Sequence, residues 1–275
     1  MPENDVEVLR AIKDGILGLH HVFGDVPAGA AGTSLICNSV PKSGTYLLVE
    51  MAKRMDFADI GYHLNTGHLE KRTPENMTEH PRPMPALLQV AALRPGQAVP
   101  AHIHFSYVLE NFLLSEPNRK MLFIIRDPRD LVISWVDYVF SSRAYRSTAW
   151  NAYSQDAAVM HHPGDEQRIS GSIEGLLNMG LENYLPWIDS PACLTIKFEE
   201  LYADLSSEGN GETVRRISDY LGQRPENIKD ALGKGRTFSG KGKMIGAHVE
   251  RMNENHRARI AQPDFQKLVL QFGYR

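Results

Sequence analysis

The sequence predicts a single α/β domain in which a central parallel sheet is flanked by helices. Apolar runs of strand length alternate with helical patterns, which favours parallel strands joined by right-handed crossovers. Most of these runs lack the alternation of a sheet with one solvent-facing side, so we expect helices on both faces. No internal repeat or linker divides the 275 residues, and a chain of this length can bury a large core.

The expected elements are an N-terminal helix at about residues 4–22, a core at about 33–250 and a C-terminal helix at about 254–272. Within the core, the apolar runs predict strands at Ser34–Val40, Ala98–Ile103, Met121–Ile125 and Ala192–Phe198. Helical patterns predict helices at Tyr46–Met55, Tyr107–Leu114, Leu131–Phe140 and Ile173–Trp187. Two stretches, Asp59–Pro85 and Tyr145–Ser172, are expected to be surface loops.

Composition narrows the class of protein. The net charge of -3 gives no overall attraction to nucleic acid or to a membrane surface. The first residues, MPENDVEVLR, do not form a signal peptide, and no stretch approaches the roughly 18 apolar residues of a membrane span. Cys37 and Cys193 lie in predicted strands, which favours buried thiols in a reducing cytoplasm over a disulfide. We therefore expect a cytoplasmic protein, and the sequence leaves its oligomeric state open.

The turn after the first strand, in LICNSVPKSGTYLLVEM, has the composition of an anion site. A turn that ends at a helix N-terminus presents backbone N–H groups to a bound anion, and Gly44 allows a close approach. Ser43 and Thr45 offer hydroxyl donors, and Lys42 offers a cation. The plainer alternative is a helix N-cap with a solvated lysine. The lysine precedes the glycine, unlike the order G-K-[ST] of the ATP-binding P-loop, so the turn is a poor magnesium–ATP site.

A second strand, turn and helix follow in MLFIIRDPRDLVISW. Asp127 is expected to be the helix N-cap and Pro128 the first helical residue. Arg126 then stands at the carboxyl edge of the strand, where ligands of open α/β sheets bind. Ser134, two turns into the helix, can complete a phosphate site with the arginine fork. The alternative is that Arg126 pairs with Asp127 or Asp130.

A third candidate anion site lies in the stretch TFSGKGKMIG, residues 237–246. Its lysines are interleaved with glycines, and Lys241 and Gly242 stand at its centre. Such backbone can wrap an anion, although a solvated glycine-rich loop has the same composition. Three candidate anion sites in one α/β domain favour a ligand with more than one phosphate-like group.

At these residues the sequence resembles the sulfotransferases that use 3′-phosphoadenosine 5′-phosphosulfate (PAPS). Their P-K-S-G-T turn, which binds the 5′-phosphosulfate, matches Pro41–Thr45 in full. Their arginine and the serine eight residues later, both on the 3′-phosphate, match Arg126 and Ser134. Lys241 and Gly242 match their C-terminal K-G loop. These motifs occur in the order of the family and span nearly the whole chain.

The resemblance implies a P-loop-NTPase-like sulfotransferase fold and transfer of a sulfuryl group from PAPS to a hydroxyl or amine. A sulfuryl group carries less charge than a phosphoryl group, so we expect in-line transfer without a metal, with Lys42 stabilising the leaving group. Lys42, His102 and Ser134 are the expected catalytic residues. The residues expected to bind the donor are Pro41, Lys42, Ser43, Gly44, Thr45, Tyr46, Arg126, Ser134, Phe198, Lys241 and Gly242.

The general base is expected in the stretch AHIHFS. The resemblance places the family histidine on His102, and histidine suits the role because its pKa lies near neutrality. His104 would project to the same side of an extended chain, so it can substitute or assist. The two histidines also resemble an H-x-H metal pair, but no further ligands at sensible spacing accompany them.

Two features depart from the family pattern: Leu47 after the turn, and Ser239–Gly240 in the C-terminal loop, where an arginine is common. Leu47 stands where the family often has a tryptophan that stacks on adenine. We expect Phe198 or Phe238 to take its place. Glu199 and Glu200, which follow Phe198, are interpreted as acids at a helix N-terminus rather than as catalytic carboxylates.

The acceptor pocket is expected to form from the loops Asp59–Pro85 and Tyr145–Ser172. Residues that are candidates to line it or lie near it are His63, His68, Tyr138 and Trp150. The acceptor is expected to be a small molecule, a lipid or a carbohydrate, and the sequence does not choose among them. Two other functions remain open: a magnesium-dependent nucleotide or small-molecule kinase, and a non-catalytic nucleotide-binding protein.

Overall fold

The computed structural model describes residues 29, 31–72, 78–139, 165–206, 211–224, 228 and 245–275. Several predictions lie outside this part of the chain: the N-terminal helix at residues 4–22, the donor-binding residues Lys241 and Gly242, and the side chains of Trp150 and Phe238. Within the described residues, no helix is both long and apolar enough to span a membrane.

The described strands form one sheet in the order β5-β4-β3-β6-β1-β7-β8, with β2 paired to β6. Their bounds are β1 Ser34–Ser39, β2 Ala58–Asp59, β3 Tyr62–Asn65, β4 His68–Arg72, β5 Thr78–Pro83, β6 Gln97–His102, β7 Arg119–Ile125 and β8 Leu194–Lys197. The strands β3, β6, β1, β7 and β8 are parallel, as predicted for the centre of the sheet. The pairs β3–β4 and β4–β5 are antiparallel, so the sheet is mixed at one edge.

The stretch Asp59–Pro85, expected to be a loop, instead contributes strands β3, β4 and β5 and the end of β2. The prediction was wrong because these short strands lack a continuous apolar run. In β4, sequence HLEKR, only Leu69 is buried. A half-exposed edge strand of this kind gives a weak sequence signal.

The described helices are α2 Thr45–Arg54, α3 Ala86–Ala91, α4 Tyr107–Ser115, α5 Pro128–Val139, α8 Asp165–Leu177, α9 Phe198–Ser206, α10 Glu212–Leu221, α12 Ala247–Arg251, α13 Glu254–Ile260 and α14 Pro263–Gln271. Helices α2, α4 and α5 fall close to the predicted positions, whereas α3 lies where no helix was predicted. Short 3₁₀ helices occur at η2 Leu181–Asn183 and η3 Leu185–Trp187.

Three helix predictions need correction. The helix expected at Ile173–Trp187 ends at Leu177 and continues as η2 and η3, because Gly180 adopts a left-handed conformation with φ 66°. The first eight residues of α8 had been assigned to a loop. The helix expected at residues 254–272 is two helices, α13 and α14, because Pro263 has no N–H to continue the ladder.

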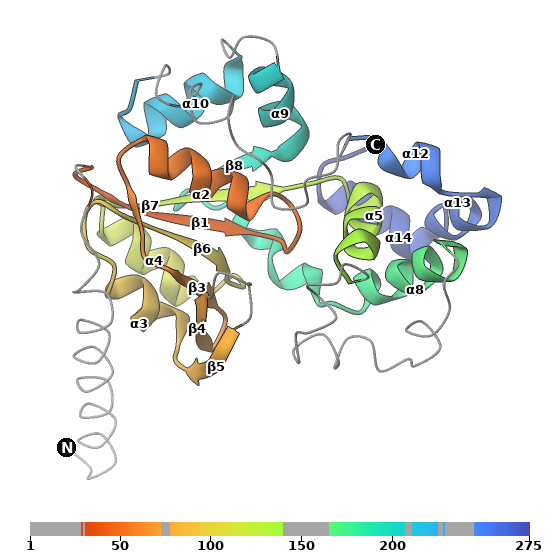
Figure 1. Ribbon diagram of the computed structural model, residues 1–275, viewed down its shortest axis with the longest axis horizontal. Coiled ribbons are helices and arrows are strands. Elements are labelled where there is room, and N and C mark those ends of the chain that lie inside the picture. Colours follow the sequence, from red (N-terminus) through yellow and green to blue (C-terminus); the bar gives the residue numbers. More distant parts are fainter. Residues whose placement is uncertain are drawn as a thin grey trace.

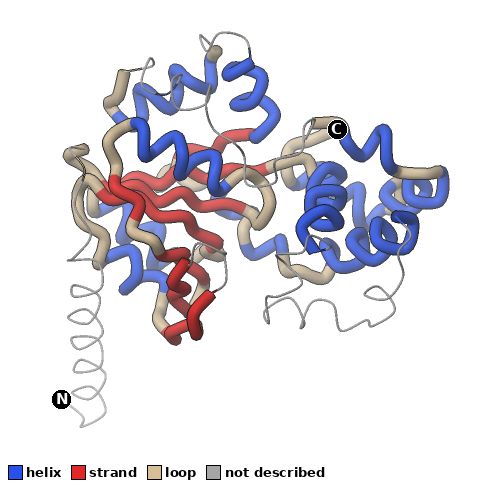
Figure 2. Tube along the Cα trace, in the orientation of Figure 1, coloured by secondary structure: helices blue, strands red, loops and turns tan. Residues whose placement is uncertain are grey.

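The sheet is covered on both faces, as predicted. Figure 1 shows α2, α9 and α10 on one face and α3 and α4 on the other, and Figure 2 shows the same layers. Alternate residues of β1 enter two apolar clusters, Leu35 and Cys37 in one and Ile36 in the other. Both cysteines are buried and unbridged, which confirms the expectation of buried thiols.

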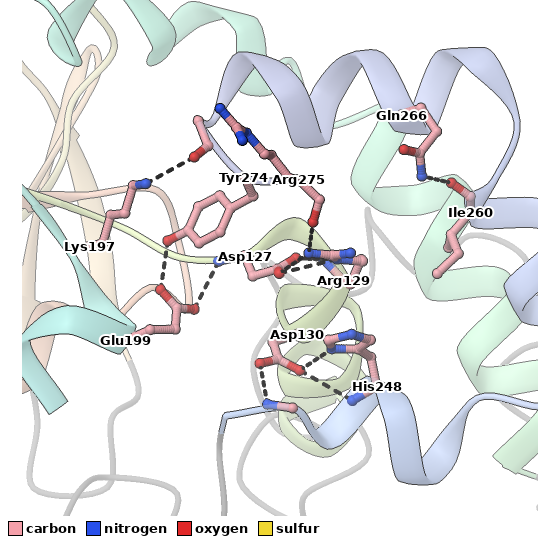
Figure 3. A network of polar contacts seen from close by, with 12 residues as sticks. Asp127, Arg129, Asp130, Lys197, Glu199, His248, Ile260, Gln266, Tyr274 and Arg275 are labelled. Carbon is pink, nitrogen blue, oxygen red and sulfur yellow. Dashed lines mark hydrogen bonds and ion pairs between the residues drawn. The ribbon is translucent and has the colours of Figure 1, made fainter. Parts of the chain in front are cut away.

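A second group of helices, α5, α8, α12, α13 and α14, lies beyond the end of the sheet to which β1 points (Figure 1). The carboxylate of Asp130, in the first turn of α5, joins α5 to the start of α12 within this group. It accepts hydrogen bonds from Gly246 N (2.8 Å), His248 N (3.1 Å) and His248 Nδ1 (2.7 Å), at the start of α12 (Figure 3). Burial raises the pKa of Asp130, but the hydrogen bonds from His248 and Gly246 outweigh it and hold the pKa below its ordinary value.

We expect Asp130→Asn to lower the free energy of unfolding at pH 7 by about 2 kcal/mol, since the new amide places N–H donors against the donors of Gly246 and His248. A depressed pKa means that Asp130 stabilises the fold above its ordinary pKa and ceases to do so as the pH falls through its folded pKa. The deficit of the variant should therefore shrink between about pH 5 and pH 3.

Urea unfolding of the variant and of the unmodified protein, at pH 7 and at about pH 3, measures this effect. Asp137→Asn is the matched control, because Asp137 lies on the same helix and bonds Arg251 of α12 at a more exposed position. Asp137→Asn should lower the free energy of unfolding by less than about 1 kcal/mol. An equal deficit for Asp130→Asn at both pH values would contradict the assigned role.

Candidate active site

The turn between β1 and α2 has an unusual backbone. Lys42 and Gly44 both have positive φ, 72° and 115°, and the N–H of Ser43 closes the turn on the carbonyl of Val40 at 3.1 Å. Lysine seldom adopts a left-handed conformation, and residues held there cluster at ligand sites. The turn therefore has the conformation of a phosphate-type binding loop rather than of a plain helix cap.

Only glycine fits at position 44. A Cβ there would lie 2.8 Å from Cδ2 of Phe198 and 3.3 Å from Cδ1 of Ile124. Gly44 is the N-cap of α2 and offers no side-chain acceptor, and the first turn of the helix contains no acidic residue. The first turn of α2 therefore supplies no acidic side chain to the positive end of the helix dipole.

The hydroxyl groups of Thr45 and Ser43 differ in their hydrogen bonding. Thr45 Oγ1 is hydrogen-bonded to Ser39 Oγ, at the end of β1. Ser43 Oγ is buried and has no hydrogen-bond partner among the described residues. A buried hydroxyl without a partner costs free energy, and an anion oxygen at the turn would satisfy it. The residues present fit a phosphate or phosphosulfate group.

The side chain of Lys42 packs against an aromatic ring. Its Nζ lies 3.9 Å from the centroid of the Tyr138 ring, on α5, as a cation–π contact. Burial, together with the charge of Arg126, lowers the pKa of Lys42 to about 8, against the opposing effect of Asp137. At neutral pH the ammonium group remains charged. Tyr138, a candidate to line the acceptor pocket, lies against the predicted catalytic lysine.

Arg126 directly follows β7 at the carboxyl edge of the sheet and is 2% exposed. Its Cζ lies 4.9 Å from the centroid of the Phe198 ring. Burial lowers the pKa of its guanidinium, and the charges of Asp130 and Glu199 oppose this shift. A buried guanidinium at this edge of the sheet is suited to a phosphate group.

The acids that follow Arg126 in sequence bond other groups. Asp127 accepts the N–H of Arg129 at 2.9 Å and pairs with the guanidinium of Arg129, which confirms Asp127 as the N-cap and Pro128 as the first helical residue. Asp130 bonds the start of α12, as described above. Ser134 lies half-buried in α5.

Phe198 lies between the two anion sites. Its ring approaches Gly44 on the turn and Arg126 on β7, and it is 1% exposed. Such burial argues against the predicted stacking of Phe198 on adenine. Leu47, in the position of the family tryptophan, is also buried, in the same apolar cluster.

His102 is bonded to the turn. Its Nδ1 lies 3.0 Å from the carbonyl oxygen of Ser39 and 3.1 Å from Ser39 Oγ. Since a carbonyl only accepts, Nδ1 carries the proton and Nε2 keeps its lone pair. Burial lowers the pKa of His102 to about 4; the bond to Ser39 opposes this, and the charge of Lys42 adds to it. The imidazole is neutral at pH 7, as a general base must be.

His63, on β3, is an aromatic neighbour of His102. The centroids of the His63 and His102 rings lie 4.4 Å apart, and Tyr46 Oη lies 3.4 Å from His63 Nδ1. Burial is the main cause that holds the pKa of His63 well below its ordinary value. Both imidazoles are therefore neutral, which avoids two adjacent buried cations.

His104 has different contacts. Its backbone N–H donates to Thr66 Oγ1 at 2.7 Å. Its ring lies edge-on to the ring of Tyr184, with the two centroids 4.7 Å apart. Strand β6 ends at His102, so the alternation that would place both side chains on one side does not extend to His104. The structure brings His102, and not His104, into hydrogen-bond contact with the turn.

Other predicted residues have ordinary surroundings. His68 bonds Glu70 at 2.8 Å. In the described part of the chain, no group of three or more His, Cys, Asp or Glu residues could hold a metal ion. Sequence reasoning missed Ser39, although a polar residue at the end of a buried strand was a readable signal.

Comparisons with known proteins identify the family. The sequence pattern of the sulfotransferase domain matches residues 33–239. The chain belongs to the sulfotransferase family. This confirms the resemblance drawn from the motifs. None of the curated proteins compared with this sulfotransferase matches its sequence.

Solved structures agree on the fold. Mouse sulfotransferase SULT7A1, complexed with PAP, aligns with a TM-score of 0.52 and 15% identity over 92% of each chain. Retinol dehydratase aligns with TM-scores of 0.50, in complex with androsterone and inactive cofactor PAP and in complex with retinol and PAP. Identity is 15% and 16%, over 93% and 94% of this chain and 85% and 86% of those chains. The predicted fold class is confirmed.

We expect Gly44→Ala to lower the free energy of unfolding by about 2 kcal/mol or more, because a Cβ both clashes with Phe198 and strains a backbone at φ 115°. Gly222→Ala, after α10, is the matched control, since its φ is 63° and no atom lies within 4 Å of the added carbon. The control should cost about 1 kcal/mol. Thermal or urea unfolding measures both, and equal costs would contradict the close packing at the turn.

Proposed function

We propose that this sulfotransferase transfers the sulfuryl group of PAPS to a hydroxyl of a small-molecule, lipid or carbohydrate acceptor. The observation that carries the proposal is the pair of cationic sites on either side of Phe198: the turn with Lys42 and Gly44, and the buried Arg126. A donor with one anionic group at each end fits two such sites. The PAP in the SULT7A1 and retinol dehydratase structures supports this choice.

The chain's own residues divide the binding of the donor. The turn Pro41–Thr45, with Tyr46 next to it, would hold the 5′-phosphosulfate through backbone N–H groups, Ser43 Oγ and Lys42. Arg126 and Ser134 would hold the 3′-phosphate, with Lys241 and Gly242 as the third predicted contact. PAPS supplies an activated sulfuryl group.

The catalytic groups lie on adjacent strand ends. His102 would accept the proton of the acceptor hydroxyl at Nε2, since Nδ1 is engaged with Ser39. Lys42 would stabilise the negative charge on the leaving phosphate oxygen. A pKa of about 4 makes His102 a weak base in the free protein. The negative charge of a donor bound at the turn raises this pKa and so strengthens the base.

The acceptor belongs to the proposal only as a class. Retinol dehydratase, which shares the fold, was crystallised with androsterone and with retinol, small apolar molecules that carry a hydroxyl. Acceptors of this kind are the first to test. The buried, neutral pair His63 and His102 favours an uncharged hydroxyl over an anionic acceptor.

Transfer of labelled sulfate from PAPS to a panel of hydroxyl acceptors, together with thermal shift, tests the proposal. We expect PAP to raise the melting temperature without added metal, because both cationic sites bind it. Magnesium–ATP should have less effect, since Lys42 precedes the glycine of the turn. Stabilisation by magnesium–ATP alone, with phosphoryl rather than sulfuryl transfer, would favour the kinase.

The pH dependence of turnover tests the base. His102→Gln should lower kcat/KM by about 100-fold or more, because it removes general-base catalysis. In the unmodified protein with saturating PAPS, the acid limb of kcat/KM for the acceptor should lie above the pKa of about 4 that His102 has without donor, since the bound donor raises that pKa and only the neutral imidazole accepts a proton. His104→Gln is the matched control and should retain this limb. Loss of activity in His104→Gln but not in His102→Gln would reverse the assignment.

A further inference from the structure

The segment Gly273–Arg275, which follows α14, is hydrogen-bonded to residues of β8, α9 and α5 near Arg126. Figure 3 shows this segment beside β8, the start of α9 and the start of α5. Lys197 Nζ donates to the carbonyl of Gly273 at 2.9 Å, and it lies 4.9 Å from the centroid of the Tyr274 ring. Arg129 Nη2 donates to the backbone oxygen of Arg275 at 2.9 Å.

Glu199 is the centre of these contacts. One carboxylate oxygen accepts the N–H of Asp127 at 3.0 Å, and the other accepts the hydroxyl of Tyr274 at 2.6 Å (Figure 3). A short O–H···O⁻ bond of this kind is charge-assisted and strong. The side chain of Glu199 therefore bridges the segment Gly273–Arg275 and the turn between β7 and α5, instead of acting only as an acid at the N-terminus of α9.

The bond to Asp127 bears directly on Arg126. The N–H of Asp127 belongs to the peptide unit that begins with the carbonyl of Arg126, and that unit is planar. Fixing this N–H therefore fixes ψ of Arg126 and the direction in which its side chain leaves the strand. The charge of Glu199 also acts on the guanidinium of Arg126, so the two groups are close enough to interact.

We propose that Tyr274 is a positioning residue for the 3′-phosphate of the donor, acting through Glu199 on Arg126. The inference rests on the proposed function, which places that phosphate at Arg126. The Tyr274 hydroxyl holds one oxygen of Glu199 while the Asp127 N–H holds the other. Without the hydroxyl, the released oxygen competes with the phosphate for the guanidinium, and the peptide after Arg126 loses part of its support.

Calorimetric titration with PAP and with AMP, which lacks the 3′-phosphate, tests the inference. Tyr274→Phe keeps the ring beside Lys197 and removes only the hydroxyl. We expect it to weaken PAP binding by about five- to tenfold and AMP binding by less than about twofold. In an Arg126→Gln background the same change should leave the ratio of the two affinities unaltered, since the effect passes through Arg126.

Tyr220→Phe is the matched control. The Tyr220 ring also lies beside a lysine, with its centroid 5.0 Å from Lys120 Nζ. The Tyr220 hydroxyl accepts the backbone N–H of Met121 on β7, near the end of that strand remote from Arg126. Tyr220→Phe should leave the PAP-to-AMP ratio unchanged. A general loosening of the protein would instead move both ligands, and both tyrosine variants, together.

The outcomes separate the inference from the proposed function. If the unmodified protein binds PAP no more tightly than AMP, the two-site donor proposal fails, and the inference with it. If it prefers PAP and Tyr274→Phe keeps that preference in full, the inference alone is overturned. Should Tyr274→Phe not fold, Glu199→Gln weakens the same bond to the Tyr274 hydroxyl and must lower the same ratio. An unchanged ratio in that variant also overturns the inference.

Discussion

The close packing of the Phe198 ring between Gly44 and Arg126 is the constraint on which the site depends. The ring leaves no space for a Cβ on the turn, and it lies under the guanidinium at the end of β7. Because Phe198 is buried and begins α9, it fixes the spacing of two cationic sites that come from different strands. A single ligand with two anionic groups can be recognised by such a fixed spacing, whereas two mobile sites would bind each group separately.

Electrostatics at the turn follow from the same packing. The site gathers Lys42, Arg126 and the N-terminus of α2, whose first turn holds no acidic residue, so the turn favours anions and disfavours further cations. Burial is the main reason that His102 and His63 remain neutral, and nearby positive charge adds to it. A bound donor would reverse part of this effect, which would link binding of the anion to the strength of the proposed base, His102.

Local signals made much of the site predictable, and long-range contacts account for the rest. The turn at Pro41–Thr45 and the N-cap at Asp127 are encoded within a few residues, so the sequence predicted both. The break before Pro263 was equally local, yet the helical pattern on either side concealed it. The bond between Glu199 and Asp127 joins residues 72 positions apart, and the burial of Phe198 depends on Gly44 and Arg126 together. Neither can be inferred from spacing along the chain.

A crystal structure of this sulfotransferase with PAP tests the central claim most directly. The account predicts that the 5′-phosphate contacts the Thr45 N–H and Ser43 Oγ at the turn, and that the 3′-phosphate contacts the guanidinium of Arg126, with Phe198 still packed between the two sites. A PAP molecule that leaves either site without a phosphate would contradict it.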